Sequence, residues 1–84
     1  MNLIEQLKRH EGLKLKPYKC TADKLTIGVG RNLEDVGISE EEAEMLLQND
    51  IQRATVQVKT EFPWTEQLDE ARFAALINFT FNVG

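Results

Sequence analysis

The stretch HEGLKLKPYKCTADKLTIGVG, residues 10–30, decides how this chain folds, because a helix end, a polar turn and a glycine-rich strand follow one another in it. A helical pattern ends at Glu11 and a glycine comes next, so we expect the glutamate to project from the helix end. Cys20 and Thr26 flank the polar turn at residues 21–24, in a segment that predicts a β-hairpin or a short three-stranded meander. One hairpin would therefore gather three chemically competent side chains.

The composition is that of one small folded domain. With 84 residues, 42% of them hydrophobic and 29% charged, the chain has the balance of a globular protein. No apolar run is long enough for a transmembrane helix, and the charged N-terminal segment lacks the apolar core of a signal peptide, so we expect the chain to start in the cytoplasm. The net charge of −4 argues against a nucleic-acid partner held by electrostatics.

The single cysteine and the single histidine limit the chemistry available. Cys20 cannot form an internal disulfide, which leaves a buried small hydrophobe or a functional thiol as its two interpretations. Cys20 and His10 do not make a metal-ligand set, so we expect no metal and no cofactor. His10, near the end of its helix, is expected to interact with the helix dipole rather than to catalyse.

The glycine-rich strand at residues 25–29 leads into two polar residues. Gly28 and Gly30 flank a valine, which predicts close approach of another backbone or of a ligand. Arg31 and Asn32 follow as polar groups that either line a cleft and bind substrate or form solvated surface. The residues themselves leave both readings open.

A long helix is expected to begin at Ser39, with Glu42 at the capping-box position. Its apolar residues recur by threes and fours and so keep to one face: Ala43, Leu47, Ile51, Ala54 and Val58. A helix of this length, about 30 Å, is typical of a connection between two lobes.

A final helix is expected after a break at residues 60–67, with Asp69 as its cap. The helix is apolar almost all round, which is typical of the centre of a bundle. The rest of the chain is too small to cover it. We therefore expect either that the chain is the front part of a longer protein, or that it completes itself as a homodimer or by domain swapping through helix 69–83.

The combined pattern resembles the phage-type lysozymes, the glycoside hydrolase family that includes the bacteriophage endolysins. The likeness runs from HEG at residues 10–12, through L-K-x-x-x-Y ending at residue 18 and TIGVGRNL at 26–33, to ALINFTFNVG at 75–84. Its most specific part is a glutamate, eight residues, a cysteine or aspartate, five residues and a threonine that opens T-I-G-x-G.

The resemblance implies an α+β, lysozyme-like fold. Residues 1–38 would form a small N-terminal lobe with the catalytic hairpin, residues 39–60 a connecting helix, and residues 61–84 the incomplete beginning of a helical C-terminal lobe. The substrate cleft would lie between the lobes.

The resemblance also implies the reaction, which is hydrolysis of the β-1,4 bond between N-acetylmuramic acid and N-acetylglucosamine in peptidoglycan. Glu11 would be the general acid. Cys20 stands where the family most often has aspartate, and it would need a lowered pKa or would only position water. Thr26 would help to place the attacking water.

The resemblance also implies where the protein acts. The protein would be made in the cytoplasm of the host bacterium and released to the cell wall by a separate pore-forming protein. The alternative is a non-catalytic, truncated lysozyme lobe that self-associates or binds a partner.

Overall fold

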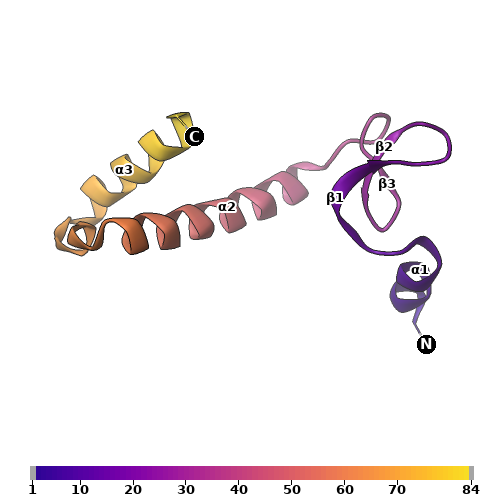
Figure 1. The fold of residues 1–84 in the computed structure, drawn as a ribbon, viewed down its shortest axis with the longest axis horizontal. Coiled ribbons are helices and arrows are strands. Elements are labelled where there is room, and N and C mark those ends of the chain that lie inside the picture. The colour runs from indigo at the N-terminus through magenta and orange to yellow at the C-terminus, as the bar shows by residue number, and fades with distance from the viewer. Residues whose placement is uncertain (1, 84) are drawn as a thin grey trace. The chain divides into compact units, whose positions relative to one another are not determined.

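The computed structural model describes residues 2–83 and divides the chain into two compact units, Met1–Ser39 and Glu40–Gly84 (Figure 1). The first unit holds one helix and a small antiparallel sheet, and the second holds two α-helices joined by a short 3-10 helix. This combination confirms the predicted α+β class.

Helix α1, Leu3–Glu11, begins and ends where its flanking residues predict. The Asn2 side chain accepts a hydrogen bond from the backbone N–H of Glu5 at 2.8 Å, which satisfies one of the free donors of the first turn. Gly12 has a φ of 79° and its N–H donates to the carbonyl of Lys8, so the helix stops there. Glu11 is thereby the last residue of the helix.

The sheet is a three-stranded antiparallel meander in the order β1-β2-β3, which is one of the two arrangements predicted for this segment. Its strands are β1, Lys14–Lys19, β2, Leu25–Gly28, and β3, Arg31–Asn32. The register includes the pairs Tyr18 with Thr26, Lys19 with Leu25, Thr26 with Asn32, and Ile27 with Arg31. Thr26 therefore lies on the middle strand, paired with Tyr18 of β1 and with Asn32 of β3.

Strand β2 is shorter than the alternating pattern predicts. Gly28 and Gly30 have φ values of 71° and 75°, in the left-handed region that interrupts a strand. Residues 29–30 consequently form the turn into β3 instead of continuing the strand. The glycines serve to reverse the chain.

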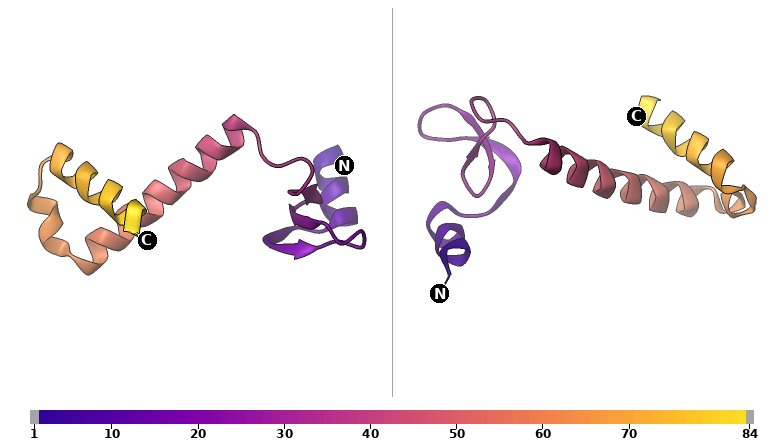
Figure 2. Two further views of the ribbon diagram at one scale, coloured as in Figure 1. Left: turned by 90° about the horizontal axis from the view of Figure 1, so that it is seen from above. Right: turned by 180° about the vertical axis from the view of Figure 1, so that it is seen from behind.

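The second unit consists of α2, Glu40–Glu61, a 3-10 helix η1, Pro63–Gln67, and α3, Glu70–Val83. Helix α3 folds back beside α2 (Figure 2). The predicted cap of α3 is present, because Asp69 Oδ1 accepts the backbone N–H of Arg72 at 2.8 Å.

The two helices bury little of their apolar surface. Val58 on α2 and Ile77 on α3 are 5% and 8% exposed, whereas Leu47 and Ile51 of the same apolar stripe are 49% and 42% exposed. Leu47 and Ile51 line an open groove of about 550 Å³ together with side chains of α3. The apolar surface predicted to stay uncovered is thus present. Within residues 2–83, no helix has the length and hydropathy needed to cross a membrane.

Candidate active site

Glu11 lies at the exposed end of α1, against the turn between β2 and β3. A Cβ added at Gly30 would be 3.3 Å from the Oε2 atom of Glu11. The glycine therefore leaves room for the carboxylate at this turn. The carboxyl group of Glu11 is thus open to solvent and lies beside the ribbon.

Cys20 and Thr26 meet at the other turn, between β1 and β2. The N–H of Cys20 donates to the carbonyl of Lys24 at 3.0 Å, and the carbonyl of Cys20 accepts the N–H of Asp23 at 2.8 Å. The Thr26 hydroxyl donates to the same Lys24 carbonyl at 2.8 Å. Thr26 is 3% exposed, whereas Cys20 is only half-buried. The thiol is thus the more accessible of the two groups.

Hydrogen bonds hold the pKa of the Cys20 thiol below its ordinary value. The backbone N–H of Lys24 has the largest effect, followed by that of Ala22 and by the Thr26 hydroxyl, while desolvation opposes them. Donors pointing at the sulfur stabilise the thiolate. The lowered pKa is the condition under which a cysteine can act as a base in place of an aspartate.

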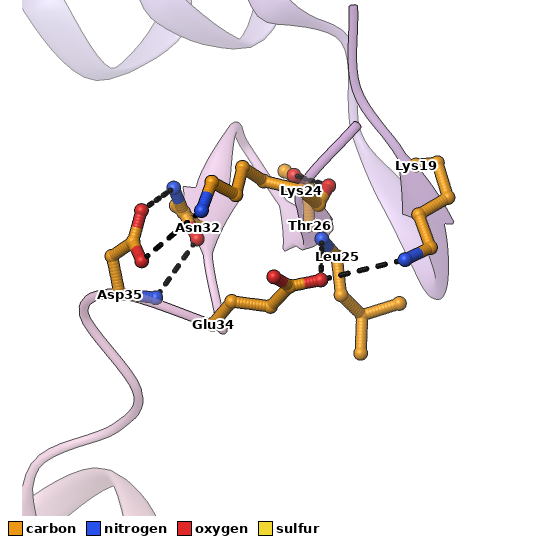
Figure 3. Close-up of polar contacts among 7 residues, drawn as sticks. All are labelled: Lys19, Lys24, Leu25, Thr26, Asn32, Glu34 and Asp35. Atoms are coloured by element: carbon orange, nitrogen blue, oxygen red, sulfur yellow. Dashed lines mark hydrogen bonds and ion pairs between the residues drawn. The ribbon is translucent and has the colours of Figure 1, made fainter. Parts of the chain in front are cut away.

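The turn after β3 braces the base of this hairpin (Figure 3). Glu34 Oε1 accepts the backbone N–H of Leu25 at 2.9 Å and lies 3.4 Å from Lys19 Nζ. Asp35 lies 3.6 Å from Lys24 Nζ. Two consecutive acidic residues therefore contact the segment that carries Cys20 and Thr26.

Arg31 and Asn32, the two predicted substrate-binding residues, contact this same turn. Arg31 Nη1 donates to the carbonyl of Gly37 at 3.0 Å. The Asn32 amide donates to Asp35 Oδ2 at 2.9 Å, and its oxygen accepts the Asp35 N–H at 3.1 Å. Through these hydrogen bonds, Arg31 and Asn32 help to shape the turn.

The structure thus brings Cys20 and Thr26 together and sets Glu11 beside Gly30, all within the first unit. Glu34 is the residue that the sequence patterns missed. It stands in a turn with no periodicity, and its contact with Leu25 depends on how the meander folds. Among the residues that the structure describes, no group of three or more His, Cys, Asp and Glu side chains could hold a metal ion.

The chain belongs to the phage lysozyme family, whose model matches residues 8–84. It is 37% identical over 82 residues to an endolysin of Acyrthosiphon pisum secondary endosymbiont phage 1, an alignment that covers 93% of this chain and 54% of that protein. It is also 38% identical over 87 residues to an endolysin of Bacillus phage B103, covering 96% of this chain and 32% of the relative. The resemblance inferred from the sequence is confirmed. The chain spans about half the length of the first relative and about a third of the second.

Proposed function

We propose that this chain carries the catalytic groups of a lysozyme that hydrolyses the β-1,4 bond between N-acetylmuramic acid and N-acetylglucosamine in peptidoglycan. The observation that carries the proposal is the arrangement of the first unit. An exposed carboxyl group ends α1 beside the ribbon, and the ribbon carries a thiol whose pKa is lowered by its own turn. Membership of the phage lysozyme family supports the same reaction.

In the proposed reaction, Glu11 protonates the glycosidic oxygen as the bond to the anomeric carbon breaks. The Cys20 thiolate accepts a proton from the water that adds to the anomeric carbon. Thr26 is almost fully buried, so its contribution would pass through the turn and through Cys20. The net change adds one water molecule across the bond, with OH on the new reducing end and H on the leaving oxygen.

Arg31 and Asn32 are proposed as contacts to the polysaccharide at the edge of the same ribbon. The register places Asn32 opposite Thr26 on the neighbouring strand, which supports a location next to the reacting groups. Their bonds to Gly37 and Asp35 would hold them in place before substrate arrives.

Digestion of purified peptidoglycan tests the proposal. The chain should release soluble fragments that end in a reducing N-acetylmuramic acid, and Glu11→Gln should abolish the release. Glu5→Gln is the matched control, because it makes the same change at another exposed glutamate of α1. Fragment release that is equal in wild type and Glu11→Gln would defeat the assignment.

A second candidate function is a non-catalytic lobe that self-associates, as a homodimer or by domain swapping through the helix at residues 69–83. The apolar groove between α2 and α3 favours it, because Phe81 is 41% exposed there. Sedimentation by ultracentrifugation should then show a dimer that Phe81→Asp dissociates. A monomer at all concentrations, together with hydrolysis, would exclude this candidate.

We further propose that the protein acts from within the host cell and causes cytolysis after release through a separate pore-forming protein. Expression inside a bacterium should then leave the cells intact until the membrane is permeabilised. Lysis without permeabilisation would contradict this route.

A further inference from the structure

We propose that Glu34 is a positioning residue that closes the base of the β1–β2 hairpin and thereby fixes the turn around Cys20. The inference rests on the proposed function for its meaning in catalysis. The effect of Glu34 on the turn around Cys20 can be tested without measuring hydrolysis.

One carboxylate oxygen of Glu34 bridges the two strands where they open into the turn. Glu34 Oε1 accepts the backbone N–H of Leu25 at 2.9 Å and contacts the Lys19 ammonium group at 3.4 Å. Lys19 and Leu25 are the last register pair before the turn. The bridge therefore lies immediately before Cys20 on one strand and immediately before Thr26 on the other. Figure 3 shows the three residues of the bridge, Lys19, Leu25 and Glu34.

The hydrogen bond from the Leu25 N–H stabilises this bridge more than the ion pair with Lys19 does. A carboxylate that accepts from an N–H forms a stronger bond than a neutral acceptor does. The Lys19–Glu34 ion pair is exposed, with 59% and 38% of the two side chains accessible, and exposed pairs contribute little. The bond to Leu25 is also the largest cause of the lowered pKa of Glu34.

The position of Leu25 matters because Lys24 precedes it. The Lys24 N–H is the principal donor to the Cys20 sulfur, and its carbonyl accepts from both Cys20 and Thr26. Asp35 adds a contact to the Lys24 ammonium group at 3.6 Å. Fixing the backbone at Leu25 therefore fixes the donors and acceptors that surround the thiol.

Positioning and simple charge predict opposite effects of removing the Glu34 carboxylate. A negative charge near a thiol disfavours the thiolate, so losing that charge alone would make Cys20 more reactive. Losing the brace would instead let the turn fray and disperse the N–H donors, which would make Cys20 less reactive. The sign of the change distinguishes the two roles.

Alkylation of Cys20 with iodoacetamide measures that sign, because the chain has 1 cysteine. The rate should be followed against pH in wild type, Glu34→Ala and Glu34→Gln. Glu44→Gln is the matched control, since Glu44 is an exposed glutamate of α2, in the other unit. Circular dichroism should be used to check that each variant is folded.

We expect Glu34→Ala, which loses the brace, to lower the alkylation rate near neutral pH by about threefold or more. Glu34→Gln loses only the charge, because the glutamine oxygen still accepts from Leu25, so it should react at least as fast as wild type. Glu44→Gln should match wild type. An unchanged or faster rate in folded Glu34→Ala, or a rate in folded Glu34→Gln as slow as that of Glu34→Ala, would overturn the positioning role. If Glu34→Ala is alkylated more slowly but the wild-type chain does not hydrolyse peptidoglycan, the positioning role stands and the proposed reaction is rejected.

Discussion

The carboxylate of Glu11 lies against Gly30, so close that a Cβ at that position would come within 3.3 Å of Oε2. This contact joins the end of α1 to the turn between β2 and β3. A side chain at residue 30 would therefore have to displace the carboxylate from its present position.

Replacement of Gly30 by alanine tests this contact. Both Gly30→Ala and Gly28→Ala force a Cβ onto a left-handed backbone, with φ values of 75° and 71°, and each should cost about 1–2 kcal/mol of unfolding free energy. Only Gly30→Ala crowds Glu11, because nothing lies within 4 Å of a Cβ at Gly28.

Urea unfolding and peptidoglycan hydrolysis separate the two effects. The variants should lose similar stability, whereas hydrolysis should fall much further in Gly30→Ala. Equal hydrolysis by the two alanine variants would show that the contact with Gly30 does not position the acid.

The Thr26 hydroxyl provides a second test. A hydroxyl group has one hydrogen, so at any moment it donates either to the Lys24 carbonyl or to the Cys20 sulfur. Thr26→Val removes this donor at nearly constant volume and should destabilise the fold by about 1 kcal/mol. It should also raise the pKa of Cys20 toward its ordinary value, as read from the pH dependence of alkylation. Thr26→Ser keeps the hydroxyl and should restore both properties; failure of serine to do so would implicate the lost methyl group instead.

The helix caps give a prediction about stability alone. Asn2 accepts from Glu5, and Asp69 accepts from Arg72, each at 2.8 Å. Alanine at either position should cost about 1 kcal/mol, measured by urea unfolding. Asn2→Asp, which still accepts the bond, should keep the stability of wild type. A loss in Asn2→Asp as large as in Asn2→Ala would refute the capping role.

Glu34 should also govern part of the stability at low pH. The Leu25 N–H, with Lys19 nearby, holds the pKa of Glu34 below its usual range. A carboxyl group with a lowered folded-state pKa stabilises the fold above its unfolded-state pKa, about 4.3, and this contribution disappears as pH falls through the folded-state value. Glu34→Gln should therefore flatten the dependence of unfolding free energy on pH below about 5. A dependence as steep as that of wild type would contradict this assignment, and Glu44→Gln serves as the control.

Local signals in the sequence were sufficient for the helices, whereas they left a hairpin and a three-stranded meander as alternatives for the sheet. Asn2, Gly12 and Asp69 act through bonds to residues a few positions away, so a short window contains the whole interaction. The turn at Gly28 and Gly30 was harder to place, because alternating residues mask a strand end that depends on left-handed φ angles.

The candidate site was predictable only as a set of residue types. The spacing of Glu11, Cys20 and Thr26 matched a family pattern, yet no pattern shows that N–H groups of the turn face the thiol. The brace from Glu34 to Leu25 joins residues nine positions apart across two turns. Such contacts arise from tertiary folding and have no periodic signature.

The most direct test of the central claim is the rate at which reducing ends appear when the chain is mixed with purified peptidoglycan. Wild type and Glu5→Gln should generate reducing ends at the same rate, and Glu11→Gln should reduce the rate to that of peptidoglycan alone. Reducing ends formed at the wild-type rate by Glu11→Gln would show that the acid beside Gly30 is not the proton donor.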